Sequence, residues 1–261
     1  MSIGGVAYDD WADVYDLWVA TAPVTAQNHA FYFSQYVAEP QGPVVELGIG
    51  TGRIALEAVR HGRPMVGVDS SAAMLALCRE RAEALGVAED LTLIQADFRD
   101  FELPEPARLI AMPFHTIGHL IDDASRMQAL GQVYRNLAPG GRFIFDHFVM
   151  DPELAHLSHN VARLRAEETA PDGRGRVLWQ CSRFDFERQQ IRILAWTDEL
   201  LANGEVVERR YRRLDFSWLE PRNARRLLEA AGFRIGQVFG SFAGDELTEA
   251  SKVQIWEAIR Q

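Results

Sequence analysis

VVELGIGTGR, residues 44–53, is a short apolar run that ends at an acid and then continues with three glycines in five positions. An unbroken apolar run of this length is typical of a strand buried on both faces. Glycine is conformationally costly to order, so we expect the backbone of this turn to approach a ligand or another segment closely. A glycine-rich turn directly after a strand is typical of the ligand-binding edge of a parallel α/β sheet.

The chain after this turn alternates between helix and strand patterns. The sequence predicts helices over 53–62, 72–86 and 124–137, and further strands over 64–69, 91–97, 107–114 and 142–148. Gly62 and Gly86 close the first two helices. Such alternation with short loops predicts a parallel sheet that is covered by helices on both faces. Right-handed crossovers then bring the carboxyl ends of the strands to one edge.

The alternation stops after Met150. Strand patterns follow over 176–186, 190–201 and 206–219, with turn residues at Pro171-Asp172-Gly173 and Asn203-Gly204. Helix and strand patterns return over 222–232, 233–242 and 253–260. We therefore predict an α/β core over 38–155 and 219–261, interrupted by an antiparallel β lobe over 156–218. A helical cap over 1–37, divided by Pro23, precedes the core.

Composition limits the partners. The chain holds 27 Lys and Arg against 37 Asp and Glu, a formal net charge of −10, so we expect no nucleic-acid partner. The only cysteines, Cys78 and Cys181, are too few for a disulfide framework or a thiolate cluster, and we expect no metal. The sequence lacks an apolar run long enough for a membrane span, and its start lacks the pattern of a signal peptide. We expect a cytoplasmic protein without a membrane partner.

The acids beside the expected strand ends indicate the kind of ligand. Glu46 would repel a pyrophosphate but suits a ligand that carries positive charge, and Gly48-x-Gly50-x-Gly52 differs from the dinucleotide pattern Gly-x-Gly-x-x-Gly. Asp69 ends the second strand, where it could accept both ribose hydroxyls.

The third strand carries a similar pair. Asp97 stands at its end and could accept from an exocyclic amine, while Phe98 could cover a purine face. All of these acids follow strands that end on the same edge, so we expect them to share one ligand.

Residues 44–146 resemble class I S-adenosylmethionine-dependent methyltransferases, through the E/DxGxGxG loop and the acids after the second and third strands. The resemblance implies a Rossmann-like, seven-stranded sheet with helices on both faces. It implies S-adenosyl-L-methionine as cofactor and S-adenosyl-L-homocysteine as product. The residues implied in binding are Glu46, Gly48, Gly50 and Gly52 at the methionine half, Asp69 with Ser70 at the ribose, and Asp97 with Phe98 at the adenine.

Two stretches resemble a narrower group. YDDWADVYDLW (8–18) is similar to the cap of small-molecule N-methyltransferases, including aminosugar N,N-dimethyltransferases and glycine N-methyltransferase. FHTIGHL (114–120) is similar to the F-x-x-I-G-H stretch of the aminosugar enzymes. The resemblance implies that Tyr15 and His119 border the acceptor nitrogen and that Tyr8 closes over the methionine portion. Toxoflavin-type N-methyltransferases have a comparable build. The lobe would roof the acceptor pocket or support oligomer contacts, which leaves a homodimer open.

We therefore expect a methyl group to pass by in-line displacement to a nitrogen of a small molecule, as in secondary metabolism. A protonated amine cannot attack, and His119 is the favoured base because imidazole titrates near working pH, with His115 as second candidate. O- or C-methylation, a nicotinamide-dependent oxidoreductase and a non-catalytic nucleoside-binding protein remain alternatives. The acidic composition favours a neutral or cationic acceptor. The lobe aromatics are expected to form its packing face; they are Trp179, Phe184, Phe186, Trp196 and Trp218.

Overall fold

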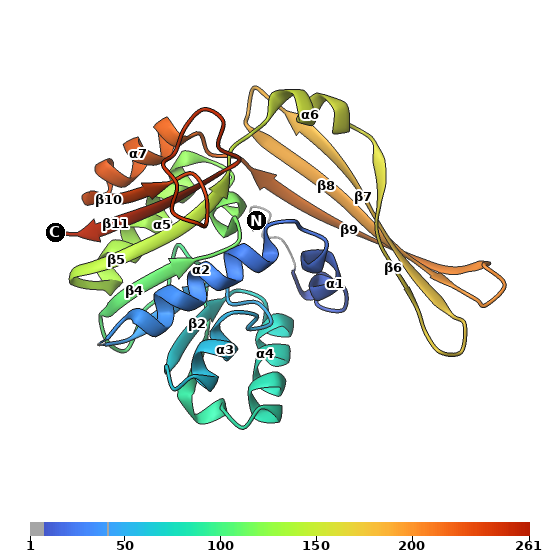
Figure 1. Cartoon of the computed structure of the whole chain (residues 1–261), viewed down its shortest axis with the longest axis horizontal. Helices are drawn as coiled ribbons and strands as arrows, with labels where there is room; N and C mark the ends of the chain where they lie inside the picture. Colours follow the sequence, from blue (N-terminus) through green and yellow to red (C-terminus); the bar gives the residue numbers. More distant parts are fainter. Residues whose placement is uncertain (1–7, 41) are drawn as a thin grey trace.

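The computed structural model describes residues 8–40 and 42–261, so residues 1–7 of the predicted cap lie outside the described residues. Two sheets organise the molecule, as Figure 1 shows: a large sheet with helices around it and a separate sheet of long antiparallel strands.

The large sheet has seven strands in the order β10-β11-β5-β4-β1-β2-β3. Strands β1 to β5 pair with one another in parallel, whereas β11 is antiparallel to both β5 and β10. The predicted α/β sheet is thereby confirmed. The bounds are β1 Val44–Leu47, β2 Met65–Asp69, β3 Leu91–Gln95, β4 Ala107–Met112, β5 Leu137–Phe148, β10 Phe233–Phe239 and β11 Val253–Arg260.

Helices cover both faces of this sheet. On one face α5 (Asp123–Asn136) and α7 (Pro221–Ala230) bury Leu130 and Leu227 against the strands. On the other, α2 (Thr25–Ala38), α3 (Ala55–Arg60) and α4 (Ala72–Ala84) bury Tyr36 and Leu75, and the short η2 (Ala88–Asp90) follows α4. Helix α5 ends at Asn136, before the predicted Leu137, which instead begins β5 with a register shift.

The second sheet has the order β6-β7-β8-β9 and follows α6 (Pro152–Ser158). Its strands are β6 Ala162–Thr169, β7 Gly175–Asp185, β8 Gln190–Leu200 and β9 Val206–Ser217. The sequence predicted three of them and missed β6, because ARLRAEET is mostly exposed and lacks apolar alternation. The Pro171–Gly173 turn joins β6 to β7, and Gly204, at φ 84°, lies in the turn between β8 and β9.

The aromatic side chains of this lobe divide between its two faces. The inner face, with Leu178 and Leu214, packs against the cap, and Trp218 is buried there too. Trp179 and Trp196 stack with ring centroids 6.1 Å apart. Because neighbouring residues of a strand point to opposite faces, this stack lies on the outer face. The expected single packing face is therefore only part of the arrangement.

The cap, η1 (Tyr8–Trp11) and α1 (Tyr15–Ala20), lies between the two sheets (Figure 1). Arg212 of β9, only 3% exposed, donates to both carboxylate oxygens of Asp13, at 2.9 and 2.8 Å. On the core side, Thr51 of the glycine loop donates to Asp16 at 2.9 Å. Ion pairs and hydrogen bonds thus fasten the cap to both the lobe and the carboxyl edge of the sheet.

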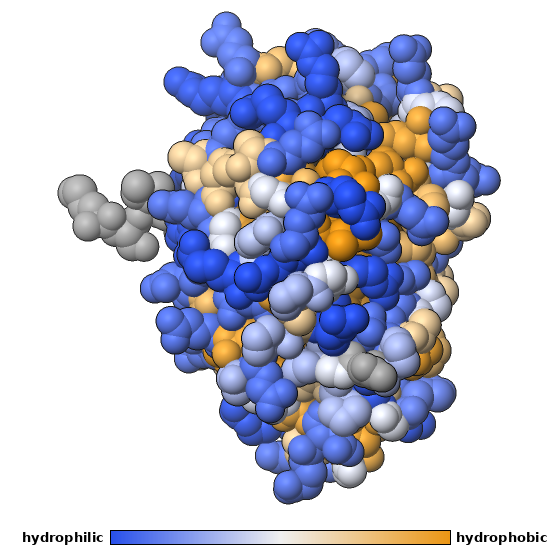
Figure 2. Space-filling model, turned by 90° about the vertical axis from the view of Figure 1, so that its left-hand side faces the viewer, coloured by the Kyte–Doolittle hydropathy of each residue, from blue (hydrophilic) through white to orange (hydrophobic). Residues whose placement is uncertain are grey.

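The surface seen from the side of β10 and the C-terminus is mostly hydrophilic, with apolar residues in small patches between charged ones (Figure 2). Isolated apolar patches of this kind are ordinary on protein surfaces. Within residues 8–40 and 42–261, no helix combines the length and hydropathy needed to cross a bilayer.

Candidate functional site

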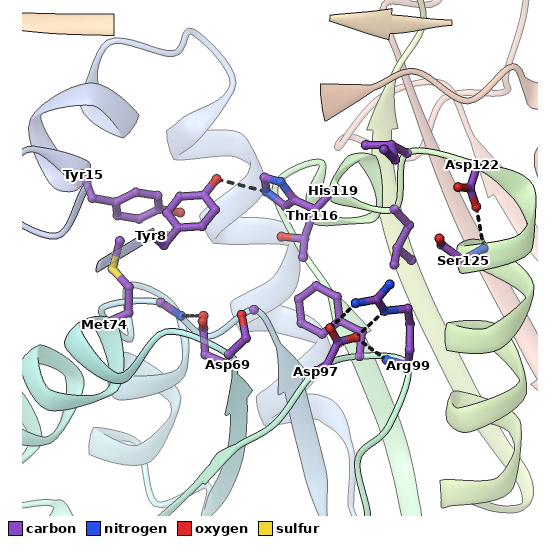
Figure 3. A pocket seen from close by; sticks show the side chains of 16 residues that line it. Tyr8, Tyr15, Asp69, Met74, Asp97, Arg99, Thr116, His119, Asp122 and Ser125 are labelled. Atoms are coloured by element: carbon purple, nitrogen blue, oxygen red, sulfur yellow. Dashed lines mark hydrogen bonds and ion pairs between the residues drawn. The ribbon is translucent and has the colours of Figure 1, made fainter. Parts of the chain in front are cut away.

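A cavity of about 170 Å³ opens at the carboxyl edge of the large sheet (Figure 3). It is enclosed by the ends of β1, β2 and β3, by the cap, and by η3 (Thr116–His119) after β4. The lining residues that sequence analysis also named are Tyr8, Tyr15, Gly48, Gly50, Asp69, Ser70, Asp97, Phe98 and His119. The topology thereby collects residues from distant parts of the chain at one edge, as parallel crossovers require.

The glycines of the loop serve two different purposes. Gly48 and Gly50 line the cavity with φ of 72° and 54°, and a Cβ on Gly48 would lie 2.8 Å from Cγ2 of Thr116. Gly52, at φ 82°, does not line the cavity; a Cβ there would lie 2.7 Å from Sγ of Cys78. Gly52 was expected to take part in ligand binding; in the structure its lack of a side chain lets the loop pack tightly on α4.

Asp69 holds the glycine loop and faces the cavity at the same time. Its Oδ2 accepts from the backbone N–H of Gly50 at 2.9 Å and its Oδ1 from that of Ser71, also at 2.9 Å. Burial raises the pKa of Asp69, while these backbone donors oppose the rise. Each carboxylate oxygen has a further lone pair, so the side chain can accept ligand hydroxyls without releasing the loop.

Asp97 is already paired, with a residue that sequence analysis missed. Arg99 donates to it from Nε at 2.8 Å and from Nη2 at 2.6 Å, and the two lie side by side in Figure 3. The hydrogen bonds from Arg99 lower the pKa of Asp97. An acid and an arginine two residues apart at the end of a strand are the signal that could have identified this pair. Phe98 lies under the loop, with Cζ 3.5 Å from where a Cβ of Gly48 would stand.

Glu46 points away from the cavity. It is 3% exposed, it accepts a hydrogen bond from the hydroxyl of Tyr36 at 2.8 Å, and it is not among the lining residues. Burial raises its pKa to about 7, despite the bond from Tyr36. The structure therefore corrects the expectation of a direct ligand contact: Glu46 supports the loop from below, between β1 and α2.

This buried carboxyl predicts a pH-dependent stability. The folded pKa of about 7 exceeds the ordinary 4.5, so folded Glu46 binds the proton more tightly and stability falls as pH rises through that interval. We expect a loss of at most about 1.4 kcal/mol per pH unit from this group. Glu46→Gln, which can still accept from Tyr36, should remove that slope, whereas the exposed Glu83→Gln should keep it. Urea unfolding across the interval measures both; equal slopes in wild type and Glu46→Gln would contradict this assignment.

A second cavity, of about 280 Å³, lies between the inner face of the lobe, the cap and the loop after β4. It is lined mainly by apolar and aromatic side chains, among them Trp18, Phe148, Phe184 and Phe216. Four residues line both cavities: Tyr8, Tyr15, Thr116 and His119. The two cavities therefore meet at a shared wall of two tyrosines, a threonine and a histidine.

Tyr8 and His119 form the centre of this wall. The hydroxyl of Tyr8 lies 3.0 Å from Nε2 of His119, which Figure 3 shows as a direct bond across the site. The His119 ring packs against Phe216 with centroids 4.9 Å apart, and burial lowers its pKa to about 4. Tyr15 packs edge-on against Tyr8 at 5.8 Å. The predicted catalytic residues Tyr15 and His119 thus both pack against Tyr8. The neutral imidazole of His119 also faces Phe216 of the lobe.

His115 lines only the second cavity, and a buried acid sets its position. Asp146, fully buried, accepts from the backbone N–H of Phe114 at 2.8 Å and of His115 at 3.2 Å, and both residues have positive φ. Nδ1 of His115 lies 3.0 Å from Oδ2 of Asp146, outside hydrogen-bond geometry. Asn28 also donates to Asp146, at 2.9 Å. This acid therefore shapes the strained loop that carries both histidines.

His, Cys, Asp and Glu side chains do not gather in groups of three or more suited to a metal anywhere in the described part of the chain. The expectation of a metal-free site remains a prediction.

Comparison with known proteins finds similarity to methyltransferases. Residues 44–141 match the family model described as a methyltransferase domain. The carboxy-S-adenosyl-L-methionine synthase of Aliivibrio salmonicida is 32% identical over 136 residues, which are 48% of this chain and 55% of that protein. An uncharacterized methyltransferase of Geobacillus thermodenitrificans is 29% identical over 205 residues, 75% of this chain and 85% of that protein. The chain thus spans about half the length of the first relative.

Solved structures support the fold over the whole chain. The CcbJ methyltransferase from Streptomyces caelestis superposes with a TM-score of 0.80 at 24% identity and covers 98% of both chains. The sugar N-methyltransferase KedS8 from Streptoalloteichus superposes with a TM-score of 0.73 at 20% identity, over 100% of this chain and 97% of that one. At these identities the likeness shows the fold, and the fold includes the lobe as well as the core.

Proposed function

We propose that this chain is an S-adenosylmethionine-dependent methyltransferase that methylates a nitrogen atom of a small molecule; the match of residues 44–141 to a methyltransferase domain and the shared fold support the proposal. One observation carries the proposal: the cavity at the sheet edge and the cavity under the lobe meet at Tyr8, Tyr15, Thr116 and His119. Two adjoining cavities allow a donor and an acceptor to be held face to face, which can supply roughly 7–11 kcal/mol of a transfer barrier.

The first cavity fits the cofactor of this fold. Asp69 has free lone pairs for the ribose hydroxyls, and Phe98 can cover the adenine on the side of the glycine loop. The positive φ of Gly48 lets the backbone approach the methionine half. Asp97 also lines this cavity, and its carboxylate keeps lone pairs for the adenine amine beside its bonds from Arg99. When bound, S-adenosylmethionine supplies an already activated methyl group.

The chain itself positions the acceptor and excludes water. His119 is partly buried, and the Tyr8 hydroxyl holds its ring at Nε2. When Nε2 carries the proton and donates to Tyr8, the unpartnered Nδ1 of the neutral imidazole can accept an N–H of the attacking amine. Thr116 and Tyr15 fill the rest of the shared wall. The acceptor must arrive as a free amine, because the low pKa of His119 makes it a hydrogen-bond acceptor for the amine rather than a base for an ammonium ion.

Methyl transfer to oxygen or carbon remains the second candidate, since the same fold serves all three by changes of loops. KedS8, which shares the fold, is a sugar N-methyltransferase; this favours nitrogen and makes amino sugars and aromatic heterocycles the first compounds to assay. The test is incubation of the protein with isotopically labelled S-adenosylmethionine and a panel of amines, phenols and sugars, followed by product analysis. Label on oxygen or carbon products alone would reject the nitrogen assignment.

A further inference from the structure

The second cavity carries one permanent charge. Arg165, on β6 of the lobe, is part of its lining, and none of the described residues that line this cavity is an aspartate or glutamate. Arg165 is half-buried, and no carboxylate among the described lining residues compensates its charge, which is unfavourable without an anionic partner. The cavity is therefore locally positive in a chain whose net charge is −10.

The hydrogen bonds of Arg165 orient its side chain without neutralising it. Nη2 and Nε donate to Oγ1 of Thr21 at 2.7 and 3.2 Å. Within residues 8–40 and 42–261 it makes no ion pair, and its Nη1 has no hydrogen-bond partner. Burial lowers the pKa of Arg165, yet a guanidinium stays protonated in proteins. A neutral hydroxyl thus holds the charged group in place, and the remaining N–H donors of this lining residue have no partner among the described residues.

A second donor follows from the direction of a short hydrogen-bond chain. Nε1 of Trp18 donates to Oε1 of Gln180 at 3.0 Å, and Nε2 of Gln180 donates to Oγ of Ser182 at 3.1 Å. An indole nitrogen can only donate, so it fixes the orientation of the Gln180 amide. Oγ of Ser182 then accepts, and its O–H remains to donate. Gln180 and Ser182 both line this cavity.

We propose that the methyl acceptor carries an anionic oxygen group, a carboxylate or a phosphate, which binds Arg165 and the hydroxyl of Ser182. This inference rests on the proposed function, and it places the anion at the lobe and the nucleophilic nitrogen at His119. Guanidinium groups bind such oxyanions through two parallel, charge-assisted hydrogen bonds. The acidic composition of the chain had favoured a neutral or cationic acceptor. The charge at the cavity is positive, opposite in sign to the net charge of the chain, and it favours an anionic acceptor.

A purely structural role for Arg165 makes a different prediction. If the side chain served only to fasten α1 through Thr21, then Thr21→Val would reproduce the effects of Arg165→Met. Under the proposal, Thr21→Val keeps the positive charge and most of the anion affinity. Arg163→Met is the matched control, because Arg163 is an exposed arginine of the same strand and is not part of the cavity lining.

The experiment measures binding to protein saturated with S-adenosylhomocysteine. Isothermal titration would compare 3-phenylpropanoate and phenyl phosphate with the neutral 3-phenylpropanamide. We expect at least one anion to bind the wild type about tenfold or more tightly than the amide, and which anion wins identifies the oxyanion. Arg165→Met should abolish the preference, and Arg163→Met should retain it. Equal binding of anions and amide by the wild type, or an unchanged preference in Arg165→Met, would overturn the inference.

A turnover assay separates this inference from the proposed function. Phenylalanine and phenethylamine differ by one carboxylate and both present a primary amine. Methylation of both at equal kcat/KM would overturn the anion inference and leave N-methylation standing. Anion preference in the titration with no methyl transfer to any amine would support the anion site and count against the proposed function.

Discussion

His119→Asn is expected to lower kcat by about 10–10²-fold, the effect of losing a hydrogen bond to a group that becomes charged, while leaving the dissociation constant for S-adenosylhomocysteine nearly unchanged. The imidazole stands in the wall shared by both cavities, 3.0 Å from the Tyr8 hydroxyl, and contributes no charge to the cofactor cavity. Asparagine keeps a polar side chain, but its shorter amide does not place an acceptor atom where the imidazole nitrogen meets the N–H of the amine as positive charge develops on the acceptor nitrogen. The lost interaction therefore belongs to the transition state rather than to cofactor binding.

The burial of His119 also determines the pH dependence. Its pKa of about 4 keeps the ring neutral at and above neutral pH, so the pH profile of kcat/KM should show no inflection near 6.5 from this residue. The decline of kcat/KM at low pH should instead follow the pKa of the acceptor amine. Folding stability has the opposite dependence to that of Glu46. The unfolded imidazole binds protons more tightly, so stability is lost as pH falls from about 6.5 toward 4, by about 3 kcal/mol at most.

Single-turnover methyl transfer and calorimetry with S-adenosylhomocysteine measure the two quantities separately. Tyr8→Phe removes the hydroxyl that meets Nε2 and should reduce kcat less than His119→Asn, because the ring itself remains. The exposed His156→Asn is the control for loss of a histidine. A loss of cofactor affinity in His119→Asn as large as its loss of kcat would show that the residue shapes the cofactor cavity instead.

The sequence predicted those parts of the site that follow from strand ends. Gly48, Gly50, Asp69 and Phe98 meet at one cavity because parallel strands with right-handed crossovers share a carboxyl edge. Glu46 shows the limit of this reasoning. Neighbouring residues on a strand point to opposite faces, so its place in the motif could not reveal that its side chain meets Tyr36 below the loop.

Contacts between distant segments could not be derived from spacing. Tyr8 and His119 are 111 positions apart and meet only because the cap folds back over the sheet. The resemblance placed Tyr15 beside His119 and put Tyr8 over the methionine portion, so it did not predict this contact. Arg165 lies on β6, the strand that the sequence analysis missed because its residues are mostly exposed and charged. The register of β6 shifts between Leu164 and Ala166, at Arg165 itself, and this irregularity could not be predicted from the pattern. The positive charge at the second cavity is therefore visible only in three dimensions.

Asp69→Ala should weaken S-adenosylhomocysteine binding by about 2–4 kcal/mol, the largest affinity loss that we expect from a single substitution in the cofactor cavity. Two interactions are removed together. The ribose hydroxyls lose a charged acceptor. The backbone N–H groups of Gly50 and Ser71 lose the carboxylate oxygens that accept their hydrogen bonds, each at 2.9 Å. Asp69→Asn keeps one oxygen that can accept and should lose about half as much.

A ligand without ribose hydroxyls separates the two contributions. If Asp69 acts through the hydroxyls, the 2′,3′-dideoxy analogue of S-adenosylhomocysteine should bind wild type and Asp69→Ala with similar affinity; if it acts by holding the loop, both ligands should lose affinity equally. The exposed Asp90→Ala controls for the loss of one acid from the same sheet region. Because the carboxylate has lone pairs for both sets of donors, we expect the hydroxyl contribution to dominate and the dideoxy analogue to lose little. Unchanged binding of S-adenosylhomocysteine itself by Asp69→Ala would show that the cofactor does not bind in this cavity. The cofactor would then have to be assigned to the second cavity and the acceptor to the first.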